Sequence, residues 1–229
     1  MTDTPERPWR NFYGRVRGKT LRPLQKTRLE GDLPALVLRG VTREENPERT
    51  PLRLPGLGVP LWLEIGFGGG EHLVHMARTY PGVTILGAEP FVNGIAQFLG
   101  KLAKDPVGNI RLHPGDARDL LELLPEGRLE KVFLNYPDPW PKARHHRRRF
   151  VTPEPLALLA RAMASGAELR VATDIEDYVR QTLEEVPPAG FALEKGPTDE
   201  AWPDWLSTRY EQKALREGRR PYYMTFRRL

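Results

Sequence analysis

The stretch that decides the fold is residues 61–71, which read Leu-Trp-Leu-Glu-Ile-Gly-Phe-Gly-Gly-Gly-Glu. The first five are apolar apart from Glu64, a pattern typical of a short strand buried in a parallel sheet. The glycines that follow allow a tight turn in which the backbone can approach a ligand closely. A helix predicted over 71–78 would offer its free N–H groups at the same place. The stretch therefore predicts a strand, a ligand-binding loop and a helix in direct succession.

Strands and helices alternate along the chain beyond this stretch. Further strands are predicted over residues 83–88, 109–112, 131–135 and 168–173, and helices over 92–103, 119–124, 153–164 and 176–186. This alternation implies right-handed crossovers and a parallel sheet covered by helices on both faces. Two last strands are predicted over 191–195 and 222–227, with residues 196–221 inserted between them. The predicted fold class is α/β, a Rossmann-like, doubly wound, mostly parallel sheet with an antiparallel C-terminal strand.

Residues 1–60 hold many Arg, Pro and Gly residues and show little periodicity, with one strand predicted over 35–38. We interpret them as a basic N-terminal arm and residues 61–229 as one domain. The chain has no cysteine, which excludes disulfides and thiolate metal sites, and no apolar run long enough for a transmembrane helix. Its N-terminus also lacks the apolar segment of a signal peptide, so we expect a cytoplasmic protein without membrane association.

Positive charge is concentrated in three segments. Residues 1–30 hold 8 basic and 3 acidic groups, residues 142–149 hold 5 basic groups, and residues 209–229 hold 7 basic and 2 acidic groups. Each segment carries a net charge of +5 and so does the whole chain, which leaves −10 for the remaining residues. If the three segments converge, they form a site for a polyanion such as a nucleic acid. The alternative is that each segment is a solvated surface.

Acidic residues stand at the ends of three successive predicted strands. Glu64 lies two residues before the first loop glycine, Glu89 lies 21 residues after Gly68, and Asp116 follows the third strand. A carboxylate at the position of Glu89 can accept hydrogen bonds from both ribose hydroxyls of a nucleotide. Asp116 could accept a hydrogen bond from an adenine amino group, and its alternative role is a helix N-cap.

The loop glycines Gly66, Gly68 and Gly70 follow G-x-G-x-G, whereas dinucleotide-binding folds carry G-x-G-x-x-G. This spacing disfavours a nicotinamide oxidoreductase. With the three strand-end acids, the loop resembles that of S-adenosylmethionine-dependent methyltransferases of the Rossmann-like class. The resemblance implies S-adenosylmethionine as the cofactor, with Glu64 facing its cationic methionine end.

Residues 136–145 read Tyr-Pro-Asp-Pro-Trp-Pro-Lys-Ala-Arg-His, a Pro-rich turn that runs into an Arg-rich segment. This stretch resembles the signature of the bacterial tRNA (guanine-N7)-methyltransferase family, a strand-terminal PDPW followed by a basic K-x-R-H run. The Glu64 loop, residues 88–89 and 172–174, and Thr-Arg-Tyr-Glu at 208–211 match that family as well. The resemblance covers about residues 60–229 and identifies them as an S-adenosylmethionine-dependent methyltransferase domain.

The resemblance implies transfer of a methyl group from S-adenosylmethionine to N7 of a guanine in the variable loop of tRNA. With the loop glycines, the expected cofactor contacts are Glu64, Gly66, Gly68, Gly70, Glu89, Asp116 and Asp138. The residues expected to contact the RNA or its target guanine are Lys142, Asp174, Thr208, Tyr210 and Glu211. Two positions depart from the family pattern, namely Arg209, where Lys is common, and Gly69, where Met is common.

The residue types suit this chemistry. Guanine N7 has an in-plane lone pair, so it attacks a sulfonium methyl without prior deprotonation, and the product base becomes cationic. Asp138, held between two prolines, can help to align the base and can stabilise that charge, which makes it the predicted catalytic residue. The guanidinium groups expected to bind RNA phosphates as forks belong to Arg144, Arg147, Arg148 and Arg149.

Several alternatives remain open at this point. Trp140 and Tyr136 can stack on a splayed base or pack in the core. His145 and His146 are adjacent in an Arg-rich run and make poor metal ligands, so no metal is expected. A methyltransferase acting on an amino nitrogen is the rival enzyme, but residues 135–138 lack the second Pro and the final aromatic of its N-P-P-[YF] motif. A non-catalytic RNA-binding module would explain the charge but not the loop acids. The oligomeric state, monomer or homodimer, stays open.

Overall fold

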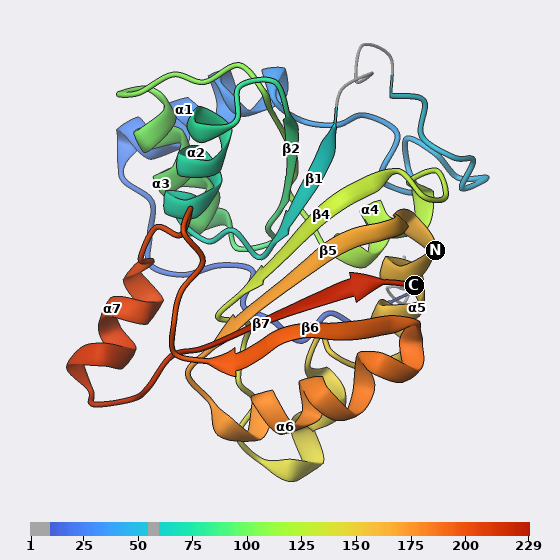
Figure 1. Ribbon diagram of the computed structural model, residues 1–229. Coiled ribbons are helices and arrows are strands. Elements are labelled where there is room, and N and C mark those ends of the chain that lie inside the picture. Colours follow the sequence, from blue (N-terminus) through green and yellow to red (C-terminus); the bar gives the residue numbers. More distant parts are fainter. Residues whose placement is uncertain (1–9, 55–59) are drawn as a thin grey trace, which may run out of the picture.

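The structure is a computed structural model that describes residues 10–54 and 60–229. In this part of the chain one sheet has the strand order β3-β2-β1-β4-β5-β7-β6. Its strands are β1 (Leu61–Ile65), β2 (Thr84–Ala88), β3 (Ile110–His113), β4 (Leu129–Asn135), β5 (Met163–Thr173), β6 (Phe191–Thr198) and β7 (Tyr222–Arg228). Strands β1 to β5 are parallel, and β7 pairs antiparallel with both β5 and β6 (Figure 1). The predicted Rossmann-like sheet with an antiparallel C-terminal strand is confirmed.

Helices cover both faces of this sheet. They are α1 (Pro23–Gly31), α2 (Glu71–Thr79), α3 (Val92–Leu102), α4 (Ala117–Leu123), α5 (Pro153–Ala162), α6 (Glu176–Glu185) and α7 (Arg209–Arg216). Short 3₁₀ helices are η1 (Leu33–Ala35), η2 (Ala143–Arg148) and η3 (Pro187–Ala189). Buried residues of α2 and α3 form one core cluster, and those of α4, α5 and α6 form the other. The arrangement is that of a doubly wound fold.

Successive side chains of a strand point to opposite faces of the sheet, which explains why there are two core clusters, one on each face. On β1, Trp62 belongs to the cluster of α2 and α3, whereas Leu61 and Leu63 belong to the cluster of α4 to α6. The chain moves from β1 outward through β2 and β3, and then crosses back to β4 on the other side of β1. The strand order therefore reverses between β1 and β4, which is where open α/β sheets bind ligands, at the carboxyl ends of the strands.

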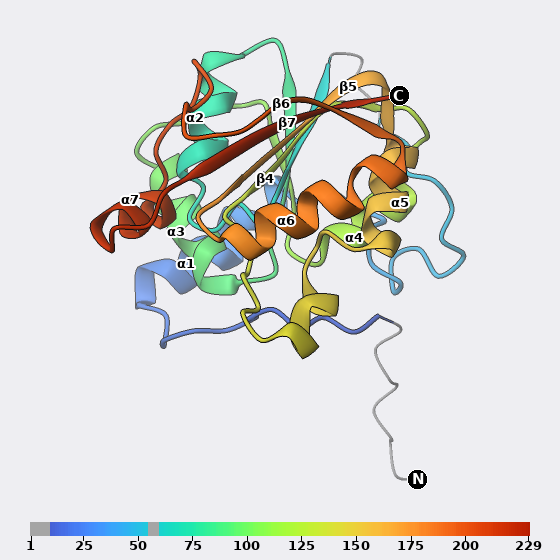
Figure 2. The same ribbon diagram turned by 60° about the horizontal axis from the view of Figure 1, so that its bottom comes forward.

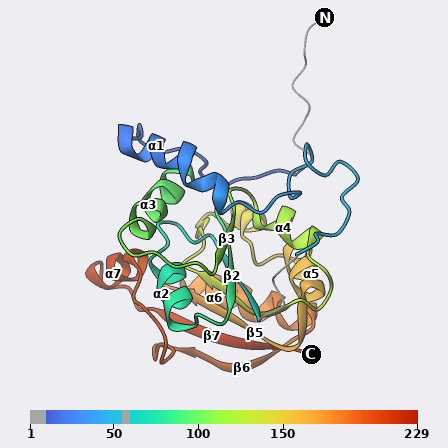
Figure 3. The same ribbon diagram turned by 90° about the horizontal axis from the view of Figure 1, so that it is seen from above.

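Much of the N-terminal segment packs against the domain. Helix α1 packs on the outer side of α3, as Figure 3 shows. The strand expected over 35–38 is wrong, because the chain forms η1 there and then a single parallel bridge from Val37 to Leu112. Val41 and Leu52 are buried in the core cluster of α4 to α6. Residues within 23–54 thus contribute to the packed core.

The insertion between β6 and β7 contains α7 and two tryptophans. The indole N–H of Trp202 donates to the Thr225 hydroxyl at 2.8 Å, and its ring lies 5.6 Å from that of Trp205. The Trp205 ring packs against His72 of α2 at 5.1 Å. The insertion therefore packs beside α2 on the face of the sheet that α2 and α3 cover. In Figure 1, α7 lies at the left, opposite the arrowhead of β7.

Candidate active site

A cavity of about 710 Å³ opens at the carboxyl ends of β1, β2 and β4, where the strand order reverses. Its size falls within the range of small-molecule and cofactor sites. The walls come from the loops after these strands, from Asp116 after β3, from Tyr210 of α7, and from residues 10–15 and 147–150. Several segments that are far apart in the sequence therefore meet at one site.

The glycine loop forms the floor of this cavity. Gly66 and Gly68 line it and have positive φ angles of 70° and 54°, a conformation that glycine adopts without a steric penalty. A Cβ on Gly66 would meet no atom within 4 Å, so this backbone faces open space. Gly70 differs, because it is the N-cap of α2 and packs against Phe98 without lining the cavity. The structure gives Gly66 and Gly68 the position expected for ligand contact and gives Gly70 a place in the helix start.

Glu89 lines the cavity at the end of β2 and is 6% exposed. Its Oε2 accepts the Gly68 N–H at 2.6 Å, and its Oε1 accepts the Phe91 N–H at 2.8 Å. Burial raises the pKa of Glu89 above its ordinary value, although the two backbone N–H groups act against this shift. Each oxygen accepts one backbone bond and has capacity for a second, which suits contact with ligand hydroxyls.

Glu64 lies behind the loop rather than in the cavity wall. It is 3% exposed, and its Oε2 is 2.9 Å from Nδ1 of the buried His72. The His72 ring is in turn packed against Phe133 at 4.8 Å and Trp205 at 5.1 Å. The carboxylate therefore supports the loop from its buried side, and a role in cofactor binding would act through its charge.

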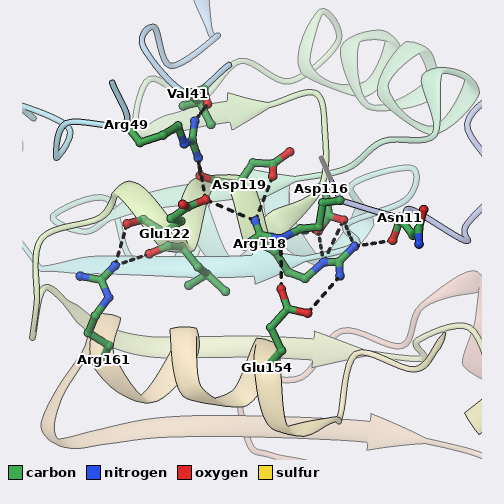
Figure 4. A network of polar contacts seen from close by, with 11 residues as sticks. Asn11, Val41, Arg49, Asp116, Arg118, Asp119, Glu122, Glu154 and Arg161 are labelled. Carbon is green, nitrogen blue, oxygen red and sulfur yellow. Dashed lines mark hydrogen bonds and ion pairs between the residues drawn. The ribbon is translucent and has the colours of Figure 1, made fainter. Parts of the chain in front are cut away.

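Asp116 caps a helix and also lines the cavity. Its Oδ1 accepts the Arg118 N–H at 2.9 Å, which confirms the N-cap of α4, and the residue also lines the cavity. The Arg118 guanidinium donates to Asp116 Oδ2 at 2.6 Å and to the carbonyl of Asn11 at 2.8 Å (Figure 4). Arg118 therefore joins this wall of the cavity to the N-terminal segment.

We call residues 10–15 the arm wall. Three carboxylates of α4 and α5 hold it, and we call them the acidic seat: Asp119, Glu122 and Glu154. Arg10 lies 3.1 Å from Asp119 and 3.1 Å from Glu154, and its side chain is 12% exposed. Arg49 pairs with Glu122 of the same seat at 3.0 Å (Figure 4). Sequence reasoning placed a basic arm here but missed its part in the cavity. The distant acids that hold Arg10 come together only in the fold.

The turn after β4 carries Asp138 into the cavity. Tyr136 and Trp140, on either side of Pro137-Asp138-Pro139, have positive φ angles of 48° and 41°. The Arg149 Nε donates to the Pro139 carbonyl at 2.8 Å and fixes the turn. Asp138 itself belongs to the exposed residues, but the cavity walls partly desolvate its carboxylate and raise its pKa. The predicted catalytic carboxylate and Glu89 therefore face the same space.

The four arginines expected to bind phosphates differ in environment. Arg144 and Arg147 are exposed, and Arg147 also lines the cavity. The Arg148 guanidinium lies 4.9 Å from the Tyr13 ring and 5.0 Å from the Trp140 ring, so η2 contacts the arm wall there (blue beside yellow in Figure 2). Arg149 does not fit the expectation, because it is 2% exposed and pairs with Asp177 at 2.8 Å. Its guanidinium is bonded to the Pro139 carbonyl and to Asp177, so it is not available to bind RNA.

The residues expected to contact RNA or guanine are only partly brought together. Tyr210 lines the cavity and is 48% exposed. Thr208 accepts the Glu211 N–H as the N-cap of α7, and Glu211 accepts the Trp205 indole N–H at 3.0 Å. Lys142 is exposed, and Asp174 is 2.8 Å from Nε of Arg219, but neither lines the cavity. Thr208 thus caps α7, and Glu211 attaches this helix to Trp205 and to Tyr223 of β7.

The hypothesis that the three basic segments converge holds only in part, because the third segment does not lie at the cavity as a whole. Arg227 pairs in register with Glu168 in the middle of β5, whereas Tyr222 pairs with Thr173 at the carboxyl end of that strand, so β7 runs away from the cavity toward its last arginines. Figure 1 shows the same separation, with the C-terminus at the arrowhead of β7 and α7 on the other side. The third segment divides because β7 runs antiparallel to its neighbour and carries its last arginines away from the site.

The described residues include no cluster of three or more His, Asp or Glu side chains that would hold a metal ion. Within the same residues no helix has the length and apolarity needed to span a bilayer.

The comparisons with known proteins point to one family. The family model described as "Putative methyltransferase" matches residues 59–224. The tRNA (guanine-N(7)-)-methyltransferase of Cereibacter sphaeroides is 67% identical over 222 residues, covering 96% of this chain and 92% of that protein. The enzyme of the same name from Paracoccus denitrificans is 64% identical and covers 98% of this chain and 97% of that protein. This chain belongs to the tRNA (guanine-N(7)-)-methyltransferase family.

Solved structures support the fold. "Structure of an Antibiotic Related Methyltransferase" superposes with a TM-score of 0.57 at 16% identity, covering 84% of this chain and 99% of that one. The 16S rRNA methyltransferase KamB superposes with a TM-score of 0.55 at 16% identity, covering 82% of this chain and 94% of that one. At such identities the likeness concerns the sheet and its helices, which confirms the Rossmann-like methyltransferase architecture.

Proposed function

We propose that this chain transfers a methyl group from S-adenosylmethionine to N7 of a guanine in the variable loop of tRNA. The observation that carries the proposal is one cavity that contains the open glycine backbone of Gly66, the buried Glu89 and the turn carboxylate of Asp138. Membership of the tRNA (guanine-N(7)-)-methyltransferase family supports it. Because the substrate is tRNA, we also propose a cytoplasmic location.

The residues around the cavity fit S-adenosylmethionine, which supplies a methyl group bonded to a positively charged sulfonium. Gly66 and Gly68 allow the ligand to lie against backbone. Glu89 would accept the ribose hydroxyls with the capacity left on its two oxygens. Asp116 lines the cavity beyond Glu89 and would face the adenine, with Arg118 fixing its carboxylate. Glu64 adds a negative charge behind the loop that favours the cationic end of the ligand.

The protein has to orient the guanine more than it has to move protons. N7 attacks through its own lone pair, so no side chain must act as a base. Alignment of the attacking atom with the methyl group supplies much of the rate enhancement in such reactions. Positive charge then develops on the base, and the Asp138 carboxylate, which lines the cavity, is placed to stabilise it. The prolines on both sides and the bond from Arg149 to the Pro139 carbonyl keep this carboxylate in place.

The RNA side of the proposal uses exposed groups near the cavity mouth. Arg144, Arg147 and Lys142 carry exposed charges next to the catalytic turn and would bind phosphates. Tyr210 would contact the guanine directly from the cavity wall. Asp174 would accept from the guanine N1–H and amino group, because the Arg219 bond leaves acceptor capacity on its carboxylate. Thr208 and Glu211 would act by holding the start of α7.

The test is incubation of the purified chain with unmodified tRNA and methyl-labelled S-adenosylmethionine, followed by chemical cleavage at N7-methylguanine. We expect about one labelled methyl group per tRNA molecule and a single new cleavage position in the variable loop. Labelled RNA that resists cleavage would support the rival methylation of an amino nitrogen. Absence of label together with tRNA binding would support a non-catalytic RNA-binding module and refute the proposal.

A further inference from the structure

Arg209 joins the first turn of α7 to the glycine loop. Its Nη2 donates to Glu71 Oε1 at 2.6 Å, and its Nη1 donates to Gln97 Oε1. Glu71 is the first residue of α2 and Gln97 belongs to α3, so a single guanidinium connects three helices around the loop. Lys101 supports the same group, because its Nζ lies 3.0 Å from Glu71 Oε1 and donates to the Gly69 carbonyl at 2.9 Å.

The contact depends on the absence of a side chain at position 69. The guanidinium of Arg209 occupies the space in which a Cβ on Gly69 would lie, and Nη2 and Cζ would both overlap with it. Gly69 does not have a positive φ angle, so its backbone does not itself require glycine. The two departures from the family pattern, Gly69 and Arg209, are therefore one structural feature. We call Gly69, Glu71, Gln97 and Arg209 the clasp.

The clasp sets the position of the next residue along the chain. Tyr210 lines the cavity, and a Cβ on Gly68 would be 3.5 Å from its Cε2 atom. The other attachments of α7 lie on its far side, where Glu211 bonds Trp205 and Tyr223. Those bonds fix the helix to the domain, whereas Arg209 fixes the edge that meets the loop. A change at Arg209 would therefore move Tyr210 relative to Gly68 without releasing α7.

We propose that Arg209 is a positioning residue for cofactor binding, which holds Tyr210 over the glycine loop through the clasp and does not bind RNA. The partners of its guanidinium, Glu71 and Gln97, belong to the helices around the loop. The hydrogen bonds from Lys101 and Arg209 lower the pKa of Glu71 against the effect of its partial burial, so this carboxylate is ionised at neutral pH. The inference rests on the proposed function, since it uses S-adenosylmethionine binding as its measure.

The first experiment compares Arg209→Ala with the wild type by calorimetry. We expect the Kd values of S-adenosylmethionine and S-adenosylhomocysteine to rise together by about fivefold, a modest effect because both partners are partly exposed to solvent. KM for the cofactor should rise similarly, whereas the Kd of tRNA, which depends on phosphate contacts away from Tyr210, should stay within about twofold of wild type. Arg209→Lys should lie between the two, because an ammonium lacks the fork that bonds Glu71 and Gln97 together. Gln212→Ala, on the exposed side of α7, is the matched control and should change nothing.

The second experiment uses the contact between Gly69 and Arg209. Gly69→Ala should weaken both cofactors about as much as Arg209→Ala, because the new Cβ displaces the guanidinium. In the Arg209→Ala background the same substitution should have less than a twofold effect, since the nearest remaining atom is the flexible Gln97 Oε1 at 3.3 Å. Such a non-additive cycle is the signature of two residues that act through one contact.

Three outcomes would overturn the clasp while leaving the proposed function in place. They are an unchanged cofactor Kd in Arg209→Ala, fully multiplicative effects in the double variant, and a loss of tRNA affinity with a flatter salt dependence. The last result would make Arg209 a phosphate contact. If the wild-type chain itself bound no S-adenosylmethionine, the proposed function would fail first and the clasp with it.

Discussion

Asp138 occupies a turn with an unusual backbone at both ends. Tyr136 and Trp140 have positive φ angles, which cost roughly 1–3 kcal/mol each in residues other than glycine. The bond from Arg149 to the Pro139 carbonyl and the ion pair from Arg149 to Asp177 hold this conformation. Backbone strain of this kind is concentrated at functional sites, and here it carries the carboxylate into the cavity.

Asp138→Asn should lower kcat for tRNA methylation by about 10²-fold, the usual effect of removing one preorganised electrostatic partner. The amide keeps the size of the carboxylate but loses the charge that opposes the developing positive base. The thermal unfolding midpoint should stay within about 2 °C of wild type, because the residue is exposed and the clamp by Arg149 is intact. A folded variant with near-normal kcat would show that Asp138 is not the catalytic carboxylate.

His113 at the end of β3 makes stability depend on pH. It is 4% exposed, and burial lowers its pKa from 6.5 to about 4. The unfolded chain therefore binds a proton below about pH 6.5 that the folded chain does not bind until about pH 4, so stability is lost as the pH falls through this window. By linkage, this histidine alone should cost about 2 kcal/mol of unfolding free energy between pH 7 and pH 5.

The check is urea unfolding of the wild type and of His113→Leu at both pH values. The wild type should lose about 2 kcal/mol more than the variant on going from pH 7 to pH 5. Parallel losses in the two proteins would mean that His113 is not buried in its neutral form.

At the scale of elements, the strands were the most predictable part. The β1 strand and the glycine loop were expected correctly, because five consecutive buried residues followed by glycines leave few alternatives. Helix α1 was missed because it has no buried residue and so carries no apolar stripe. Helix α7 was missed for a related reason, since Glu211 and Ala214 are its only buried residues and tryptophans outside the helix attach it. Elements held by a few polar contacts bury too few apolar residues to be recognised from the sequence.

The residues of the candidate site could likewise be predicted only in part from the sequence. The strand-end position predicted Glu89 as a ligand contact, and the family resemblance predicted Asp138; the structure places both in the lining of one cavity, because the carboxyl ends of parallel strands meet at one edge of the sheet. The arm wall was not predictable, because Arg10 is held by acids more than 100 residues away in sequence. The burial of Arg149 was not predictable either, since nothing in a run of arginines marks the one that turns inward.

Arg10→Ala should loosen the arm wall without unfolding the domain. The substitution removes the contacts with Asp119 and Glu154, and the remaining ties include the bond from the Gly18 N–H to Asn93 Oδ1 at 2.7 Å. Hydrogen exchange at Gly18 should speed up by about tenfold, whereas exchange in β1 and β4 should be unchanged. Arg39→Ala, which removes an exposed pair with Glu45, is the control. Equal exchange at Gly18 in all three proteins would mean that the acidic seat does not hold the arm.

At the scale of the whole molecule, the exposed arginines that we propose to bind tRNA lie beside the cavity. Replacing Arg144 and Arg147 with Ala should weaken tRNA binding and flatten its salt dependence by roughly one unit per lost phosphate contact. Cofactor affinity should hardly change. Arg227→Ala removes a charge away from the cavity and should leave the salt dependence as it is. If the control flattened the slope as much as either arginine, the binding surface would extend well beyond the cavity.

The central claim is that the base attacks through N7 in the cavity between the glycine loop and the Asp138 turn. The most direct measurement replaces the variable-loop guanines of an otherwise unmodified tRNA with 7-deazaguanine, which has a carbon in place of N7. Base pairing and phosphates are unchanged, so this tRNA should bind with wild-type affinity and accept no methyl group from labelled S-adenosylmethionine. Methylation of the 7-deazaguanine tRNA at the rate of the unmodified tRNA would contradict the account.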